Sequence, residues 1–287
     1  MWVSTERADL HCHTTKSDGT FTPTELVEEA ARRGLAAIAI TDHDSVDGIE
    51  EALGAAKRTQ VRVVPGVEIS TDVDDGEVHI LGFCMDYKDE GLLALLERQR
   101  ESRMRRVEQM IRKLAVLGIS LNMEDVLEHA GEGAVGRPHI AAAMVSAGYV
   151  LTWDEAFAHY IGFHAPAYVR RSKLTPYEAI EAILAARGVP VLAHPGLADK
   201  DEMIPGLVEC GLGGIEAFYP HHTPAQQERY ERIADEYGLI ATGGSDCHGP
   251  LSQSGVVLGA ATTDYEVVLS LYERALATRG GQEPRLI

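Results

Sequence analysis

Five short apolar runs in this 287-residue chain each end in a side chain that could bind a metal ion. His11 and His13 end the first run and alternate with Cys12, so on an extended segment both imidazoles face one side and can bind one ion together. The later runs end in His43, in Glu68, in His194 and in the pair Asp246 and His248. Neutral imidazoles mixed with carboxylates suit divalent transition metals, and several such ions in one pocket suit phosphoester hydrolysis. We therefore expect a multinuclear metallohydrolase.

This pattern supports three residues as metal ligands that would be weak candidates alone. Glu68 ends a valine-rich run, where an unpaired buried carboxylate would be costly, so a ligand that bridges two ions explains it better than a surface glutamate. Asp18 alone fits a turn, and His79 alone fits an ordinary strand histidine. Together with the other candidates, both become candidate metal ligands.

The elements that must position these side chains follow a repeating order. Three helix starts place Thr at the N-cap, Pro at the first helical position and Glu or Gln three residues after the Thr, which is a capping box. These helices begin after Thr22, Thr175 and Thr223, and their expected stops are Gly34, Gly188 and Gly238. Each is followed at once by an apolar strand-like run. Barrels of parallel strands joined in this way carry their active sites at the C-terminal edge of the strands.

Seven apolar segments fit strands: Ala8–Leu10, Ala36–Thr41, Val61–Glu68, Val78–Cys84, Val189–Ala193, Gly214–Phe218 and Leu239–Thr242. Seven is one short of the usual eight, so we expect an α/β fold built on a smaller or distorted (β/α) barrel with mostly parallel strands. The metal-binding barrel would comprise residues 1–91 and 164–287.

The segment 92–163 breaks this rhythm, because no convincing strand occurs in it. Apolar residues from Leu93 to Leu114 recur at three- and four-residue spacing, which predicts one long amphipathic helix. We expect a helical insertion that interrupts the barrel and covers its mouth. The basic residues between Arg98 and Lys113 are interleaved with glutamates, which favours a solvated helix face.

Composition limits the class of partner. A net charge of −18 argues against a broad basic face that grips long nucleic acid, but a few arginines could still bind a nucleotide or a short oligonucleotide. Four cysteines without CxxC pairing favour free thiols, and strand alternation should turn Cys12 and Cys247 away from the ligands. The N-terminus lacks a basic segment before an apolar stretch, and no run approaches about 18 apolar residues. We expect a soluble cytoplasmic protein with no membrane segment and no obligate protein partner.

Candidate substrate contacts lie outside the ligand set. Arg137 and His139 open an expected helix after a glycine, where a guanidinium is a natural phosphate clamp. Arg170 lies where the insertion returns to the barrel. His221 and His222 follow the sixth expected strand, where either could contact substrate or donate a proton to the leaving group.

These motifs resemble the polymerase and histidinol phosphatase (PHP) superfamily. The matching segments are Asp9–His13, Thr41–His43, Gly66–Glu68, His79, Ala193–Pro195 and Gly244–Gly249. All nine ligand positions of that family find a matching residue in this chain. The resemblance implies a distorted seven-stranded (β/α) barrel that holds two or three divalent ions, often manganese, with zinc or iron as alternatives.

The resemblance also divides the ligands among the ions. His11, His13, Glu68 and Asp246 would hold the first ion, Glu68 would bridge to a second held by His79 and His194, and Asp18, His43 and His248 would hold a third. The segments Gly136–His139 and Ala167–Val169 resemble a stand-alone subgroup with a helical insertion. Members of that subgroup act on nucleoside 3′,5′-bisphosphates or trim short RNA from the 5′ end.

We therefore expect a metal-dependent phosphomonoesterase in which a hydroxide bridging the ions attacks phosphorus in line. The catalytic residues would be Glu68, Asp246 and His194. Arg137 and Arg170 would orient the phosphates, with Arg137 on the phosphate that is not cleaved. The leading substrate is a nucleoside 3′,5′-bisphosphate such as the adenosine compound, which would lose its 3′-phosphate and give AMP.

Three alternatives stay open. A 5′→3′ exoribonuclease on short RNA comes first, and a histidinol-phosphate phosphatase comes next. An amidohydrolase acting on C–N bonds would use a related histidine-rich barrel but typically needs a lysine near the metals, and no lysine lies at any expected strand end.

Overall fold

The computed structural model describes residues 6–74, 76–130, 133–170, 174–250, 252 and 255–278. Its strands are β1 (Arg7–Asp9), β2 (Ala37–Ile40), β3 (Arg62–Val73), β4 (Gly76–Phe83), β5 (Val189–Leu192), β6 (Gly214–Phe218), β7 (Ile240–Gly243) and β8 (Thr263–Asp264). They form a single sheet in the order β7-β6-β5-β4-β3-β2-β1-β8. Each of the seven predicted strands is present, and β8 adds a short antiparallel edge beyond β1.

The helices fall into two groups along the chain. Those interleaved with the strands are α1 (Pro23–Arg33), α2 (Ile49–Ala56), α7 (Pro176–Ala185), α8 (Pro195–Ala198), the 3-10 turn η2 (Asp201–Met203), α9 (Ile204–Glu209), α10 (Pro224–Tyr237) and α11 (Tyr265–Thr278). Those between β4 and α7 are α3 (Glu90–Val116), α4 (Met123–Ala130), α5 (Arg137–Ser146), α6 (Trp153–Ala156) and the π-helical turn η1 (Phe157–Ile161). None of the described helices is long and apolar enough to cross a membrane.

The sheet curls into a barrel because the chain continues past β1 and β7 in hydrogen-bonding contact. The backbone N–H of Leu10 donates to the carbonyl of Gly243 at 3.2 Å, and that of Asp246 donates to His11 at 2.8 Å. Cys12 pairs with Cys247 as an isolated parallel bridge. These contacts bring the first and last ligand segments side by side.

Strand β4 departs from the predicted parallel order, since it runs antiparallel to both β3 and β5. Parallel neighbours need a crossover connection, whereas β3 and β4 pair from Val73 and Gly76 onward and so form a hairpin. The reversal has a consequence for the site. It pairs His79, near the start of β4, with Ser70, two residues beyond Glu68 on β3.

The capping boxes at Thr22, Thr175 and Thr223 are all present. The predicted stops at Gly34 and Gly238 are confirmed by left-handed φ values of 72° and 64°, which glycine adopts without strain. Helix α7 ends earlier than predicted, at Ala185.

Three apolar clusters stabilise the fold. One lies inside the barrel, where Val64 and Leu81 meet Val268 and Leu271 of α11. A second lies between the strands and the outer helices, and it includes the buried Cys12 and Cys247. These two cysteines are free and turned into that cluster, as predicted.

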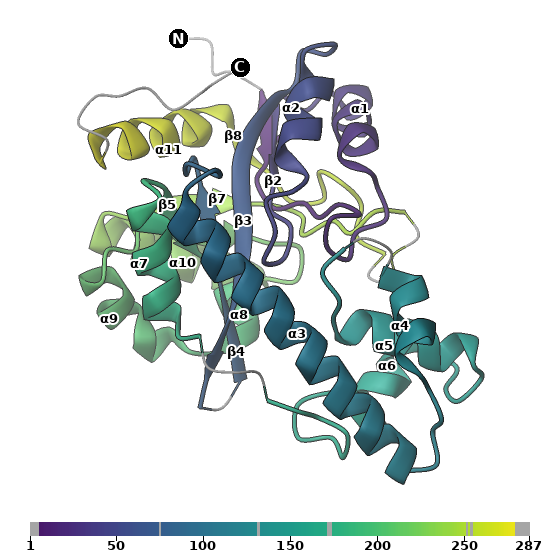
Figure 1. The fold of residues 1–287 in the computed structure, drawn as a ribbon. Helices are drawn as coiled ribbons and strands as arrows, with labels where there is room; N and C mark the ends of the chain where they lie inside the picture. The colour runs from purple at the N-terminus through teal and green to yellow at the C-terminus, as the bar shows by residue number, and fades with distance from the viewer. Residues whose placement is uncertain are drawn as a thin grey trace.

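The third cluster belongs to the helices between β4 and α7. Val107, Met110 and Leu114 of α3 lie in it, whereas Leu92 and Leu96 of the same helix lie in the cluster around the barrel. Figure 1 shows α3 extending from the strands to α4, α5 and α6. This long helix therefore packs against the barrel with its first half and against α4, α5 and α6 with its second half.

Gly244 offers a test of barrel closure. A Cβ at this position would lie 2.4 Å from both the backbone nitrogen and the Cβ of His11, so Gly244→Ala must push the two ligand segments apart. We expect urea denaturation to show a loss of about 1–3 kcal/mol in the free energy of unfolding. Gly54→Ala in α2 is the control, because its Cβ meets nothing within 4 Å and alanine favours a helix. Equal stability of the two variants would contradict this account of closure.

Candidate metal centre

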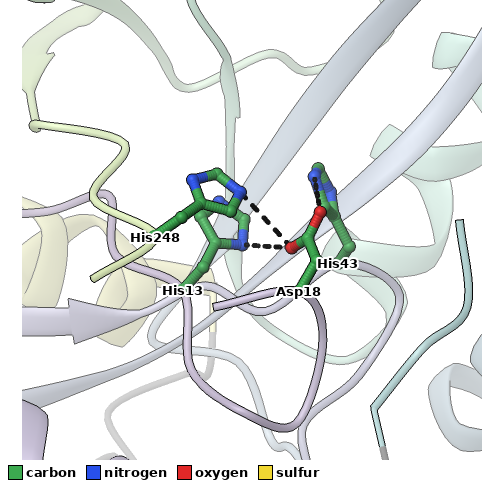
Figure 2. Close-up of side chains that lie close together, drawn as sticks. All are labelled: His13, Asp18, His43 and His248. Atoms are coloured by element: carbon green, nitrogen blue, oxygen red, sulfur yellow. Dashed lines mark ion pairs between the residues drawn. The ribbon is translucent and has the colours of Figure 1, made fainter. Parts of the chain in front are cut away.

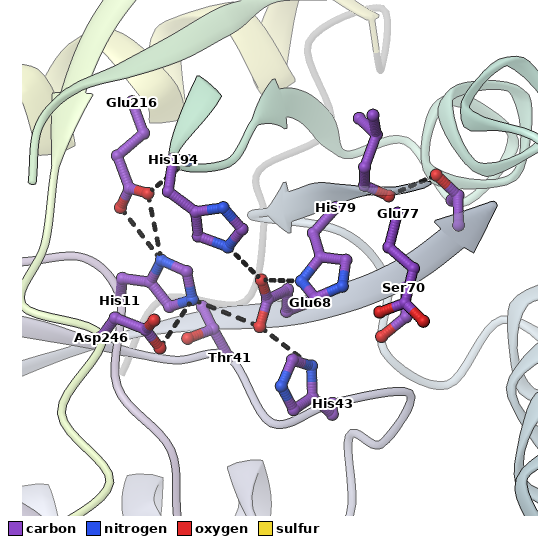
Figure 3. Close-up of polar contacts among 12 residues, drawn as sticks. His11, Thr41, His43, Glu68, Ser70, Glu77, His79, His194, Glu216 and Asp246 are labelled. Carbon is purple, nitrogen blue, oxygen red and sulfur yellow. Dashed lines mark hydrogen bonds and ion pairs between the residues drawn. The ribbon is translucent and has the colours of Figure 1, made fainter. Parts of the chain in front are cut away.

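Glu68 lies at the centre of the barrel mouth with its side chain 1% exposed. Its Oε1 lies 2.8 Å from Nδ1 of His79 and 3.0 Å from Nε2 of His194. Its Oε2 faces three more ring nitrogens, namely Nδ1 of His43 at 2.9 Å, Nε2 of His13 at 3.2 Å and Nε2 of His11 at 3.3 Å. Figure 3 shows side chains from separate strands converging on this one carboxylate. Both oxygens of Glu68 are thus surrounded by imidazoles.

Several of these atoms are buried and lack a hydrogen-bonding partner among the described residues. They are Nε2 of His11, Nε2 of His13, Nδ1 of His43, Oδ1 of Asp18 and Oε2 of Glu68. A buried polar atom without a partner is costly, and proteins retain few of them without a functional reason. Unpartnered imidazole nitrogens facing carboxylate oxygens are the donor set of a divalent transition metal. The residues therefore fit the metal ions that the sequence predicts.

The candidate ligand atoms form three groups, each with its members within 4.8 Å of one another. The groups are His11, His13, Glu68 and Asp246; His13, Asp18, His43 and His248; and His43, Glu68 and His79. The first equals the expected first set, and the second contains the expected third set (Figure 2). The remaining group holds His43 where His194 was expected, although His194 still contacts Glu68.

Partners behind the histidines determine which ring nitrogen faces the cluster. Nδ1 of His11 lies 3.0 Å from Glu216 Oε1; a carboxylate only accepts, so this nitrogen donates and Nε2 keeps its lone pair for a metal. Nδ1 of His248 likewise donates to the backbone carbonyl of Asp246 at 2.9 Å, which leaves its Nε2 facing Asp18.

Sequence reasoning missed two buried residues of this shell. Glu216, 1% exposed, also accepts a hydrogen bond from the backbone of His194 at 2.8 Å. The hydroxyl of Tyr219 donates to Oδ2 of Asp246 at 3.0 Å. A charged side chain between Ile215 and Ala217 in an apolar strand was the signal available for Glu216.

Opposite charges shift the pKa values of the cluster. Burial alone would lower the pKa of His13, but the carboxylates of Asp246 and Glu68 beside its ring raise the pKa to about 10. Burial would raise the pKa of Glu68, but His43, His11 and His79 hold it well below its usual range. Protons and metal ions therefore compete for the same nitrogens, so metal affinity should rise with pH.

Backbone strain also concentrates at the cluster. Asp44, His194 and Asp246 have φ values of 50°, 27° and 55°, a region that non-glycine residues rarely adopt. Such strain persists where the surrounding contacts hold it, and it is common at functional sites.

The long helix α3 reaches this centre through two arginines that do not fit the prediction of a solvated basic face. The prediction holds for Arg98, Arg105, Arg112 and Lys113, which are exposed. Arg103 is buried and donates from Nε to Asp44 at 2.6 Å and from a terminal nitrogen to Ser70 at 2.8 Å. Arg106, also buried, donates to Glu77 at 2.9 Å. The glutamates interleaved with these arginines suggested a solvated face. Both arginines lie instead on the buried face of the helix.

Arg137 is brought to the edge of the mouth. It donates to Glu77 at 2.8 Å, and Glu77 lies two residues before His79 on the same face of β4. Its guanidinium lies 5.6 Å and 5.8 Å from the ring centres of Phe157 and Tyr168. This placement suits a phosphate contact next to the metal ligands.

The other predicted substrate contacts lie differently. His139 is buried and accepts a hydrogen bond from its own helix start at Gly136. His222 uses both ring nitrogens, donating to the carbonyl of Ala217 and accepting from the N–H of Gly196. It therefore positions the first turn of α8, next to His194, and has no nitrogen left for substrate.

Arg170 was expected at the phosphate and lies elsewhere. It is exposed and donates to the carbonyls of Val73 and Asp74 at the hairpin tip. Val73 is five residues beyond Glu68 along β3, which places this contact roughly 16 Å from the centre of the site.

Comparison with known proteins supports a phosphoesterase. A model of the PHP domain matches residues 9–126. A 5′-3′ exoribonuclease from Haemophilus influenzae is 36% identical over 251 residues, covering 86% of this chain and 91% of its own length. A phosphoribosyl 1,2-cyclic phosphate 1,2-diphosphodiesterase from Eggerthella lenta is 35% identical over 84% of this chain and 94% of its own length. A 3′,5′-nucleoside bisphosphate phosphatase from Chromobacterium violaceum is 34% identical over 84% of this chain and 87% of its own length.

Solved structures agree in fold. A protein from Bifidobacterium adolescentis, provisionally described as a metal-dependent phosphoesterase, is 34% identical, with a TM-score of 0.87 over 94% of this chain and 96% of its own. A second structure is that of a protein from Chromobacterium violaceum described as an amidohydrolase, solved with bound sulfate and no metal. It is 33% identical, with a TM-score of 0.81 over 90% of this chain and 91% of its own. The chain therefore belongs to the PHP family of metal-dependent phosphoesterases.

Proposed function

We propose that this chain hydrolyses the bond between phosphorus and the 3′-oxygen of nucleoside 3′,5′-bisphosphates, converting adenosine 3′,5′-bisphosphate to AMP. The observation that carries the proposal is the Glu68 carboxylate, whose two oxygens face five imidazoles at 2.8–3.3 Å. A carboxylate surrounded in this way is suited to lie between two cations. The Chromobacterium relative with the bisphosphate phosphatase name supports the choice of substrate.

The nine predicted ligands would hold two or three divalent ions, with manganese the first choice and zinc or iron the alternatives. When bound, such ions neutralise phosphate oxygens and lower the pKa of water. Asp246 is held for this role by the hydroxyl of Tyr219, and His194 by its backbone bond to Glu216. The catalytic set is thus Glu68, Asp246 and His194.

The substrate's second phosphate would bind Arg137. Glu77 holds this guanidinium beside His79, where it can pair with a phosphate that is not being cleaved. We further propose that residues 92–163 form the covering insertion on a barrel of residues 1–91 and 164–287. A mouth lined by arginines in an acidic chain suits a small nucleotide and disfavours long nucleic acid. Cysteines without disulfide spacing suit a reducing, cytoplasmic location.

Glu68→Gln preserves the side-chain shape and removes the negative charge. We expect elemental analysis of manganese-loaded protein to show loss of at least one ion per chain, and turnover to fall by about three orders of magnitude or more. Glu29→Gln is the matched control, since Glu29 is buried and paired with arginines of α1 outside the site. Full metal content and near-normal turnover in Glu68→Gln would exclude a bridging role.

Arg137→Ala tests the second-phosphate contact. We expect kcat/KM for adenosine 3′,5′-bisphosphate to fall roughly 30- to 150-fold, the equivalent of about 2–3 kcal/mol for a charge-assisted pair. An aryl phosphate, which lacks a second phosphate, should be hydrolysed almost normally. Arg170→Ala removes an arginine at the hairpin tip and should change neither substrate's turnover. Equal losses on both substrates in Arg137→Ala would assign Arg137 to the phosphate that is cleaved.

A further inference from the structure

Asp42 lies at the barrel mouth and is fully buried, yet it belongs to none of the three groups of candidate ligands. Its carboxylate accepts three hydrogen bonds, all from uncharged donors of one loop. The donors are the backbone N–H of Thr14, the hydroxyl of Thr14 and the hydroxyl of Ser17, each at 2.7 Å. Hydrogen bonds to an ionised acceptor are about twice as strong as neutral ones, so Asp42 fixes the position of this loop firmly.

The loop held by Asp42 carries the candidate ligand Asp18. The backbone carbonyl of Thr14 accepts hydrogen bonds from the N–H groups of Ser17 and Gly19, both at 3.0 Å. The chain therefore turns back on itself at Asp18. Because Asp42 binds the residues at both ends of this turn, Thr14 and Ser17, the direction in which Asp18 points depends on the Asp42 carboxylate.

Asp18 faces the ligands of the expected third ion (Figure 2). Its Oδ1 lies 3.3 Å from Nε2 of His248, and its Oδ2 lies 3.9 Å from Nε2 of His43. The same loop also holds His248, since the backbone N–H of Thr20 donates to the carbonyl of His248 at 2.8 Å. Of the three ligand groups among the described residues, one alone contains Asp18 and His248. The position of the loop therefore matters most for the third ion.

The main chain of Asp42 fixes this loop relative to the central carboxylate. The backbone carbonyl of Asp42 accepts a hydrogen bond from the N–H of Glu68 at 3.2 Å. His43, the next residue, pairs with Glu68 as an isolated parallel bridge. Asp42 thus contacts the Asp18 loop with its side chain and the Glu68 segment with its backbone.

The ligands expected for the first ion are held by other contacts. The backbone N–H of His13 donates to the carbonyl of Cys247 at 2.9 Å, and that of Asp246 donates to the carbonyl of His11 at 2.8 Å. Neither bond involves the side chain of Asp42. Removal of that side chain should therefore leave these ligands in place.

We propose that Asp42 is a positioning residue for the third ion, because its carboxylate holds the loop of residues 14–20 so that Asp18 and His248 can bind one cation together with His43. The proposal rests on the metal set of the proposed function. It adds that the third site can be weakened selectively, without emptying the sites around Glu68.

Asp42→Ala tests this role through metal binding alone. We expect dialysis of metal-free protein against increasing manganese, followed by elemental analysis, to show a third binding step weakened about 10- to 100-fold, with the earlier steps unchanged. Asp42→Asn should restore most of the loss, since its amide oxygen can accept from Thr14 and Ser17 and its NH₂ can donate to the Thr14 hydroxyl. Glu29→Ala removes a buried carboxylate outside the site and should change no step.

A second pair of variants tests the same contact from the loop. Thr14→Val keeps the shape of the side chain and removes the hydroxyl that donates to Asp42, so it should weaken the third step in the same direction but less. Thr14→Ser keeps the hydroxyl and should bind the third ion like the wild type. If thermal unfolding shows that Asp42→Ala does not fold, this pair decides the question. Equal third-step affinities in Thr14→Val and Thr14→Ser would then overturn the proposal.

Anomalous diffraction identifies the ion that is lost. In crystals of manganese-loaded Asp42→Ala, the missing peak should be the one beside Asp18 and His248. A peak retained there, or an equal weakening of every binding step, would overturn the proposal.

Metal binding is measured without substrate, so the two proposals can fail separately. Selective loss of the third step without hydrolysis of adenosine 3′,5′-bisphosphate by the wild type would retain the role of Asp42 and reject the proposed function. Hydrolysis by a wild type that binds only two ions at saturating manganese would do the reverse.

Discussion

Five imidazoles meet the two oxygens of the buried Glu68 carboxylate, and the rest of the site is arranged around that contact. Imidazole nitrogens packed against one carboxylate leave several buried lone pairs unsatisfied, so the arrangement is stable only when protons or metal cations supply positive charge. Glu216 behind His11 orients its ring so that Nε2 faces the cluster with its lone pair, and the negative charge of Glu216 strengthens the binding of a cation there. The cluster is therefore built for cations.

The barrel places these side chains together by bringing segments that are distant in the sequence to one edge of the sheet. Backbone bonds between the ends of β1 and β7 place His11 next to Asp246, and the antiparallel course of β4 brings His79 back to Glu68. Helix α3 then adds Arg103, whose bond to Asp44 links this helix to the loop that carries His43. Helix α3 is thus joined to the candidate metal centre by a buried ion pair as well as by apolar packing.

The strands and the capping boxes could be predicted from the sequence, because apolar runs and Thr-Pro-x-Glu motifs depend only on local geometry. The candidate ligands could be identified in the sequence because they end apolar runs or stand out from them. Long-range partners were not: Glu216 looked like an isolated strand residue, and Arg103 lay among glutamates that suggested a solvated face. For His222 and Arg170, the chemical type suggested a substrate contact. Their hydrogen-bonding partners lie on α8, on β6 and at the end of β3, and only the tertiary structure brings these partners to them.

The central claim is that Glu68 lies between at least two cations. Anomalous diffraction at the manganese absorption edge, from crystals of the manganese-loaded protein, tests it most directly. We predict at least two peaks flanking the Glu68 carboxylate, one of them among His11, His13 and Asp246. A single peak, or peaks that leave Glu68 without a metal contact, would contradict the account.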